Sequence, residues 1–320
     1  MSRETTRQTR REFIKSSALV AGAVAVGSSA TAQEPKLPMR VLGRTGIEIS
    51  LLSLGLGAAG DGRVDPDVVR EIVNLCIDEG VTYIDDAPIY GNTQATIGPV
   101  LTQRRSDVTV ASKVEAQDRA GALKQLEQSR RDLQCDVIDV AFIHNVPDFD
   151  TEQMMGPEGA FTALREAREA GHVRFLGLSG HNRPGRFIST IETGEVDVVM
   201  MPMNFVDRHT YNFENTVLPA AAKQNCGVLC MKVLGGVPNW NYRNIGHANL
   251  AAHYTDAIRY AVTLPGVASA VMGLCTPDEA RQAIATIKSA EPLDDAELAT
   301  ILAKGKGLVD GLGYHYGPAV

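Results

Sequence analysis

The chain has 320 residues, of which 44% are hydrophobic and 22% charged, and its formal net charge at pH 7 is −7. This composition is ordinary for a globular chain with a large core, and the acidic balance argues against nucleic acid as a partner. The length suits one barrel of eight βα units, which needs about 250 residues, so no second domain is required.

The first 32 residues have the pattern of an export signal. Arg10 and Arg11 precede Glu-Phe-Ile-Lys, an uncharged run rich in Ala and Val spans residues 16–30, and Ala30-Thr31-Ala32 offers a cleavage site. The segment resembles a twin-arginine signal peptide and is too short for a stable membrane span. We expect residues 1–32 to be this signal and residues 33–320 to form the barrel. A basic tail or an uncleaved anchor is the alternative.

Export would fix both the location and one partner of the protein. We expect the twin-arginine machinery to deliver it to the periplasm or the extracellular space. Because the leader carries five basic and two acidic residues, its removal would leave a net charge of −10.

Beyond the leader, strand and helix patterns alternate. Residues 39–49 predict a β-hairpin with Gly43 and Gly46 at its turn, and residues 294–307 predict a terminal helix. Alternation predicts parallel strands with right-handed crossovers, and eight units favour a closed (β/α)8 TIM barrel. The eight apolar runs begin at Leu51, Thr82, Val108, Ile138, Phe175, Val198, Gly227 and Ala268.

An open doubly wound sheet is the competing α/β fold. Gly55, Gly57 and Gly60 match the GxGxxG pattern of a dinucleotide-binding turn. The match is weak, because the next strand offers no acidic ribose ligand other than Asp85.

The five cysteines have no zinc-binding spacing. Because twin-arginine substrates fold before export in a reducing compartment, we expect free, buried thiols. Cys76 and Cys135 fall on predicted helices, Cys226 and Cys230 flank a strand, and Cys275 follows the last strand.

Four polar residues lie at or just past predicted strand ends: Asp85, Tyr90, Lys113 and His144. Parallel barrels build active sites at that edge. A carbonyl oxygen that receives a hydride must be protonated, and Tyr90 can supply the proton. We expect the Lys113 ammonium to lower the pKa of Tyr90, Asp85 to hold Lys113, and His144 to orient the carbonyl.

The stretch YIDDAPIYGNT at residues 83–93, with ASKV at 111–114 and FIHN at 142–145, resembles the aldo-keto reductase superfamily. The resemblance spans roughly residues 40–290 and covers the Asp, Tyr, Lys, His tetrad of that family. It implies an oxidoreductase that moves a hydride between NADP or NAD and a small carbonyl or alcohol substrate, with Tyr90 as general acid and base.

The resemblance also implies a cofactor site, from which the chain departs in part. Ser179 matches a residue that holds the nicotinamide carboxamide, whereas Gly180, Met200 and Met231 replace an Asn, a Gln and a stacking aromatic of the family. Acidic residues open the last helix, so NAD is as plausible as NADP. The full set of expected cofactor residues is Gly57, Ser179, Met200, Met231, Lys232, Leu234, Gly235, Gly273, Thr276 and Glu279.

Lys232 is expected beside the pyrophosphate, and Gly57 beside the nicotinamide. Since an exported reductase has no obvious supply of reduced cofactor, we hypothesise that the cofactor is bound tightly and travels with the folded protein.

Substrate residues must be read from loops. Trp240, the only tryptophan, follows the seventh strand and offers a face for a sugar or another polar carbonyl compound, or else packs on the rim. His181 and Phe205 are further candidates, and residues 314–317 either fold over the mouth or stay disordered.

Two other functions compete. One is a regulatory barrel that binds the cofactor without useful turnover. The other is a metal-dependent hydrolase or isomerase using Asp85, Asp86, His144 and His181, although Lys113 among such ligands makes a metal site unattractive.

Overall fold

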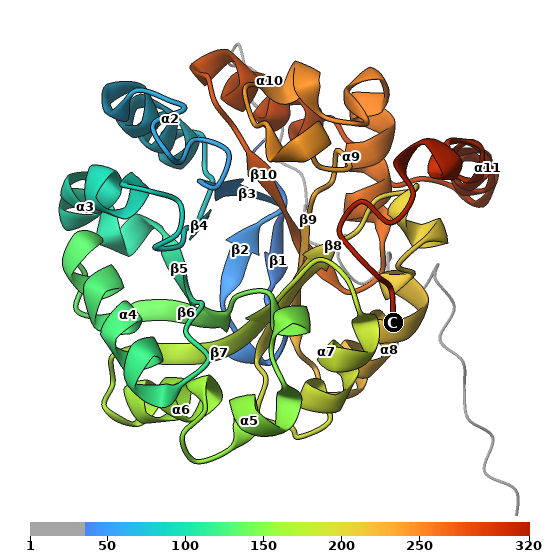
Figure 1. The fold of residues 1–320 in the computed structure, drawn as a ribbon. Coiled ribbons are helices and arrows are strands. Elements are labelled where there is room, and N and C mark those ends of the chain that lie inside the picture. Colours follow the sequence, from blue (N-terminus) through green and yellow to red (C-terminus); the bar gives the residue numbers. More distant parts are fainter. Residues whose placement is uncertain (1–35) are drawn as a thin grey trace, which may run out of the picture. The chain divides into compact units, whose positions relative to one another are not determined.

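The computed structural model describes residues 36–320, so the predicted signal peptide lies outside the described residues. Eight parallel strands close into a barrel in the order β10-β3-β4-β5-β6-β7-β8-β9 (Figure 1). The predicted TIM barrel is confirmed. The strands are β3 (Leu52–Gly55), β4 (Tyr83–Asp85), β5 (Thr109–Val114), β6 (Ile138–Ile143), β7 (Val173–Ser179), β8 (Val198–Pro202), β9 (Gly227–Met231) and β10 (Val267–Gly273).

Helices follow the strands and form the outer layer of the barrel (Figure 1). Each crossover returns the chain to the same end of the sheet, so all strands point their carboxyl ends to one face. The helices are α2 (Pro66–Asp78), α3 (Thr93–Arg104), α4 (Arg119–Asp132), α5 (Thr151–Met155), α6 (Ala160–Glu169), α7 (Pro184–Ile191), α8 (Phe213–Lys223), α9 (Tyr254–Thr263), α10 (Pro277–Lys288) and α11 (Asp295–Leu312).

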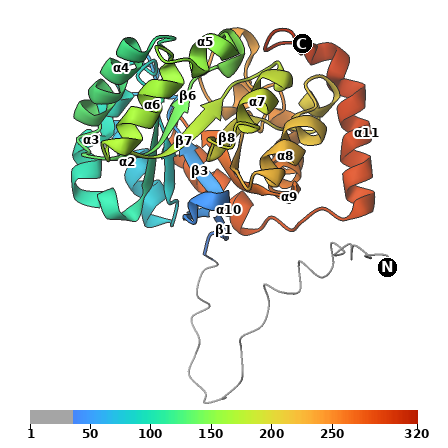
Figure 2. The same cartoon turned by 90° about the horizontal axis from the view of Figure 1, so that it is seen from below.

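The predicted hairpin is also present. Strands β1 (Met39–Val41) and β2 (Glu48–Ser50) pair antiparallel and lie at the end of the barrel opposite the C-terminus (Figure 2). Leu42 and Ile49 are fully buried and join the cluster of side chains inside the barrel. The hairpin therefore closes the amino end of the barrel and leaves the carboxyl end for a site.

The terminal helix is longer than the sequence predicts. Asp294 and Glu297 form a capping box at its start, as residues of these types favour. The predicted helix ends at residue 307, but α11 continues to Leu312, and Gly313 with φ of 55° follows it. Gly305 is needed within the helix, because a Cβ there would lie 2.0 Å from the Phe205 carbonyl oxygen.

All five cysteines lie in the described part of the chain, and all are free and buried, as expected. Two of them sit differently from the prediction. Cys135 follows α4 in a turn, and Cys230 lies within β9 rather than beside it. Among residues 36–320 no helix is both long and apolar enough to cross a bilayer.

Candidate active site

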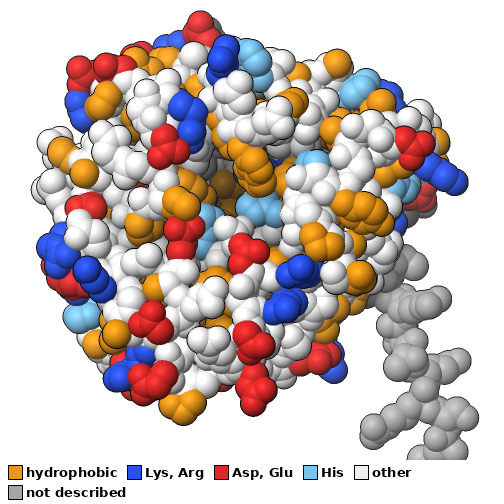
Figure 3. Space-filling view, in the orientation of Figure 1, with side chains coloured by type: hydrophobic (Ala, Val, Ile, Leu, Met, Phe, Trp, Pro, Cys, Tyr) orange, Lys and Arg blue, Asp and Glu red, His pale blue; other side chains and the backbone are white. Residues whose placement is uncertain are grey.

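A cavity of about 550 Å³ opens at the carboxyl ends of the strands. The face around it is hollowed at its centre, with histidine and hydrophobic side chains lining the hollow (Figure 3). Asp85, Tyr90, Lys113 and His144 all line this cavity, so the structure brings the four predicted catalytic residues together.

Asp85 and Lys113 form a buried ion pair. Asp85 ends β4 and is opposite Ala111 of β5, and Lys113 lies two residues further on the same face of β5. Lys113 Nζ donates to Asp85 Oδ2 at 2.7 Å and to the backbone oxygen of Asp86 at 2.9 Å. The Lys113 side chain is completely inaccessible, so its charge depends on these two partners.

Tyr90 lies in the loop between β4 and α3, with its ring over Lys113. The Nζ of Lys113 is 4.8 Å from the ring centroid. A Cβ at Gly57 would lie 3.1 Å from the ring carbon that carries the hydroxyl, so this glycine makes room for the phenol.

The expected lowering of the Tyr90 pKa is wrong in direction. Burial, followed by the charges of Asp85 and Asp86, raises the pKa of Tyr90 well above its ordinary value. The ammonium of Lys113 is balanced by Asp85 and faces the ring rather than the hydroxyl oxygen. Tyr90 therefore keeps its proton throughout the neutral range.

His144 follows β6 and stands edge-on to Tyr90, with ring centroids 5.9 Å apart. Its Nδ1 lies 3.1 Å from Glu115 Oε1. Burial lowers the pKa of His144, and Glu115 opposes that effect. Glu115 was not among the predicted site residues; it directly follows β5, two residues beyond Lys113.

Asp86, which the sequence suggested only as a metal ligand, is a second residue beside Lys113. Its carboxylate is fully buried, and Oδ1 accepts hydrogen bonds from the Ala87 N–H and the Thr93 hydroxyl, whereas Oδ2 has no partner. Burial raises the pKa of Asp86 to about 7. A carboxyl group that changes charge near neutrality thus lies directly behind the Lys113 ion pair.

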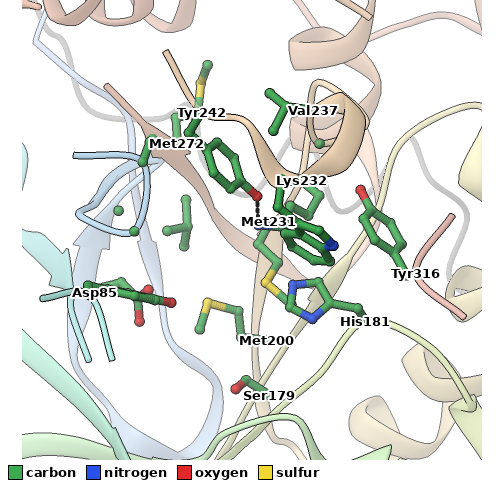
Figure 4. A pocket seen from close by; sticks show the side chains of 18 of the residues that line it. Asp85, Ser179, His181, Met200, Met231, Lys232, Val237, Tyr242, Met272 and Tyr316 are labelled. Carbon is green, nitrogen blue, oxygen red and sulfur yellow. Dashed lines mark hydrogen bonds between the residues drawn. The ribbon is translucent and has the colours of Figure 1, made fainter. Parts of the chain in front are cut away.

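Most of the predicted cofactor residues face the cavity, but three do not. Ser179 and Met231 end β7 and β9, Met200 lies within β8 between them, and all three point into the cavity (Figure 4). Gly235, Thr276 and Glu279 are outside its lining. Those that line it are Gly57, Ser179, Met200, Met231, Lys232, Leu234 and Gly273.

Lys232 has partners of its own within the protein. Its Nζ donates to the Tyr242 hydroxyl (Figure 4). The same Nζ lies 5.2 Å from the Trp240 ring centroid. Its backbone φ is 53°, a left-handed conformation that is uncommon for a residue other than glycine. The two aromatic side chains therefore hold the ammonium at the wall of the cavity.

Residues 233–250, which follow β9 and border the cavity, are called the strap. Thr276 and Glu279 position it. Thr276 caps α10, and Glu279 accepts hydrogen bonds from the backbone N–H of Ile245 at 2.8 Å and of Cys275 at 2.7 Å. Arg63, from the loop after β3, lies over the Tyr242 ring of the strap at 5.8 Å. The strap is thus anchored by the segments after β10 and β3, which are neighbouring strands of the barrel.

Two of the three predicted substrate residues line the cavity, and one does not. His181 and Trp240 line the cavity, with ring centroids 5.4 Å apart. Phe205 does not: it is completely buried and packs against Tyr260 and His253, so we no longer consider it a substrate contact. The C-terminal tail folds over the mouth and adds Tyr316 to the lining.

Metal binding finds no support in the described part of the chain. Within residues 36–320 there is no group of three or more His, Cys, Asp or Glu side chains that could hold a metal ion. Lys113 Nζ bonds to Asp85 Oδ2 and to the backbone oxygen of Asp86, whereas the Asp86 carboxylate bonds to Ala87 and Thr93.

Comparisons with known proteins agree with this geometry. Aldo-keto reductase YhdN of Bacillus subtilis is 28% identical over 60% of this chain and 62% of its own length, so the chain spans less than two thirds of that relative. L-galactose dehydrogenase of Arabidopsis thaliana is 23% identical over 88% of this chain and 99% of its own length.

A solved structure supports the fold alone. Aldo-keto reductase AKR11C1 of Bacillus halodurans, in its holo form, is 21% identical with a TM-score of 0.67, over 84% of this chain and 96% of its own. The model of the aldo/keto reductase family matches residues 51–255, which include all four tetrad positions. The chain therefore belongs to the aldo/keto reductase family of oxidoreductases.

Proposed function

We propose that this protein is an NAD(P)-dependent oxidoreductase that interconverts a small carbonyl compound and its alcohol, with Tyr90 as general acid and base. The single observation that carries the proposal is the buried Lys113–Asp85 pair, 2.7 Å long, beneath the ring of Tyr90. A fully buried ammonium needs a reason to be there, and a negative charge developing on a substrate oxygen is such a reason.

Each residue then has a role in proton handling. Tyr90 remains protonated because burial raises its pKa, so it is ready to donate to the oxygen of a carbonyl substrate. Lys113, whose Nζ lies 4.8 Å from the Tyr90 ring centroid, would place a positive charge beside the phenolate that remains after donation, and Asp85 balances part of that charge. His144 is neutral because burial lowers its pKa, and it offers a polar contact to the same oxygen without adding charge.

The residues present fit a nicotinamide dinucleotide. When bound, such a cofactor would supply or accept the hydride. Ser179, Met200 and Met231 would surround its ring, with the methionines packing on it through their polarizable sulfur atoms. Gly57 would lie beside the nicotinamide as well, and Gly273 and the strap residue Leu234 would border the rest of the molecule. The side chains do not favour NADP over NAD.

Substitution of one hydroxyl tests the proposal. Tyr90→Phe should lower hydride transfer, followed at the nicotinamide absorbance band, by roughly 10²–10⁴-fold while leaving nucleotide binding intact. Tyr83→Phe is the matched control, because this tyrosine is buried inside the barrel and does not line the cavity. Full turnover by the Tyr90 variant would refute the proposal.

The same assay distinguishes an enzyme from a regulatory barrel that only binds the cofactor. A barrel that binds cofactor without turnover would show nucleotide binding but no absorbance change in a single-turnover experiment with any carbonyl or alcohol. The hydrogen bonds of the tetrad favour catalysis, since a regulatory role would not need a buried ammonium beside a phenol.

We also propose that the protein is exported with its cofactor enclosed. The twin arginines and the Ala-Thr-Ala site support export, and the anchored strap supports slow release of a bound nucleotide. Replacing Arg10 and Arg11 by lysine should retain the chain in the cytoplasm, as cell fractionation would report. Nucleotide should be released on denaturing the purified mature protein after expression with the leader, and its absence would count against a travelling cofactor.

A further inference from the structure

Asp86 contacts the catalytic lysine, although it does not itself line the cavity. It directly follows β4, and its side chain is fully buried. Its backbone oxygen accepts a hydrogen bond of 2.9 Å from Lys113 Nζ, and the same nitrogen donates to Asp85 at 2.7 Å. Because Asp86 meets Lys113 through its backbone, its carboxylate is free to bind another part of the chain.

The carboxylate of Asp86 joins the end of β4 to the start of α3. Its Oδ1 accepts from the Ala87 N–H at 2.8 Å and from the Thr93 hydroxyl at 2.7 Å. Thr93 is the first residue of α3, and Asn92 before it makes no side-chain cap to that helix. Asp86 therefore ties the first turn of α3 to a barrel strand, at the end of the helix where its dipole favours a negative charge.

Tyr90 lies in the short segment between these two attachment points. Its backbone oxygen is 3.2 Å from the Thr93 hydroxyl, and its N–H donates to the Ala87 carbonyl at 3.0 Å. On the other side the Tyr90 backbone meets Gly60, where a Cβ would lie only 2.6 Å from the same oxygen. The backbone of Tyr90 is thus fixed by two residues that are both bonded to Asp86.

The carboxylate of Asp86 is only half satisfied. Its Oδ2 is buried and has no hydrogen-bond partner, so burial favours the neutral form of the group. Burial accordingly raises its pKa to about 7, against the hydrogen bonds from Thr93 and Ala87. Among the charged groups around it, Lys113 lowers this pKa and Asp85 raises it. Asp86 therefore changes charge near neutrality while it holds the Tyr90 segment.

The charge of Asp86 also acts on the phenol of Tyr90. After burial and the charge of Asp85, the charge of Asp86 is the next cause that raises the pKa of Tyr90. Ionisation of Asp86 thus opposes the loss of a proton from Tyr90, and carbonyl reduction requires that loss. The neutral form of Asp86 is therefore the one that favours proton donation.

We propose that Asp86 is a positioning residue of the reaction: it holds the Tyr90 segment in place over Lys113, and its ionisation slows proton donation by Tyr90. The hydroxyl of Thr93 carries the first effect, and the buried negative charge carries the second. Asp86 acts through its neighbours and does not contact the substrate, and its role in the reaction rests on the proposed function.

The pH dependence of carbonyl reduction tests the effect of the charge. With benzaldehyde or cyclohexanecarboxaldehyde and saturating NADH or NADPH, kcat should fall by about three- to tenfold to a lower plateau as pH rises through about 7. Asp86→Asn cannot ionise and keeps an acceptor oxygen, so it should lack this step and retain the faster rate at about pH 8. An unchanged step in Asp86→Asn would overturn the inference.

Asp207→Asn is the matched control. Asp207 is also buried, and burial also raises its pKa to about 7, but it lies in the short helix after β8 and does not line the cavity. This variant should keep the step near pH 7. Loss of the step in the Asp207 variant and not in Asp86→Asn would assign the titration to the wrong residue and refute the proposal.

Variants of Thr93 separate positioning from charge. Thr93→Val removes the hydroxyl between Asp86 and the Tyr90 backbone, and should lower kcat by about three- to tenfold with less than about a twofold change in the nucleotide Kd. Because that hydroxyl lowers the pKa of Asp86, its loss should also move the step to higher pH. Thr93→Ser should restore both. A slower Thr93→Val enzyme whose step has not moved would show a structural role alone and count against the proposal.

An NMR signal of Tyr90 separates this inference from the proposed function. The Cζ resonance of isotope-labelled tyrosine, identified by its loss in Tyr90→Phe, should shift with a midpoint near pH 7 in the full-length chain but not in Asp86→Asn. A signal without that midpoint would overturn the inference. If the shift is present but no carbonyl compound or alcohol is turned over, the action of Asp86 on Tyr90 stands and the reductase assignment falls. If an aldehyde is reduced with a step that Asp86→Asn retains, the reductase assignment stands and the role of Asp86 falls.

Discussion

Replacing Lys113 by methionine removes one partner of the most deeply buried ion pair in the described part of the chain. The change keeps most of the side-chain volume and leaves Asp85, itself only 4% exposed, without its cation. Breaking a buried pair in this way costs about 3–5 kcal/mol, because the remaining charge has lost both water and partner. We expect Lys113→Met to be strongly destabilising as well as inactive.

The expected shift in melting temperature follows from the size of the barrel. An unfolding entropy of ~2.1 cal/mol/K per residue, over about 285 described residues, amounts to roughly 0.6 kcal/mol/K. A loss of about 3–5 kcal/mol therefore lowers the melting temperature by roughly 5–8 °C. Differential scanning calorimetry on the purified variant measures it.

The control is Lys304, a surface lysine whose ion-pair distance is close to that of Lys113. Lys304 Nζ lies 2.6 Å from Asp256 Oδ2, but both side chains are more than a third exposed. Lys304→Met should therefore lower the free energy of unfolding by less than about 1 kcal/mol. Adding Asp85→Asn to Lys113→Met should restore at least half of the lost stability, since it removes the stranded charge. Equal losses for the two lysine variants, or a double variant that is less stable than Lys113→Met, would refute the reasoning.

Three further predictions concern neighbouring groups. Burial raises the pKa of Asp86 from 3.8 to about 7. Between these values the folded protein keeps a proton that the unfolded chain releases. The contribution of Asp86 to the free energy of unfolding therefore falls as pH rises from about 4 to 7. Asp86→Asn should thus raise the melting temperature more at pH 8 than at pH 5; equal gains would contradict it. Glu115→Gln removes a charge that raises the pKa of His144, so the His144 limb in the pH profile of kcat/KM should move to lower pH. Glu279→Ala frees the backbone of Ile245 in the strap, so bound nucleotide should dissociate faster in a stopped-flow chase, and an unchanged rate would show that the strap does not retain it.

The barrel and the meeting of the tetrad could be predicted from the sequence. Eight alternating units fix parallel strands, and parallel strands end at one face, so Asp85, Lys113 and His144 had to meet wherever the exact strand limits fell. Local signals were sufficient because each of these residues is positioned by its own strand. Glu115 directly follows β5, so its place beside His144 depended on how the chain leaves the strand.

The surroundings of each group depended on the tertiary structure. The direction of the Tyr90 pKa shift is set first by burial and then by the charges of Asp85 and Asp86, at and just after the end of β4, and Lys232 is engaged by aromatic side chains of the strap. Phe205 lies outside the cavity because α11 packs against its backbone. Asn182 and Tyr316, 134 residues apart, meet only after the tail has folded over the mouth. Such contacts join segments that no periodicity relates, and burial and electrostatic interactions arise only when those segments are packed together.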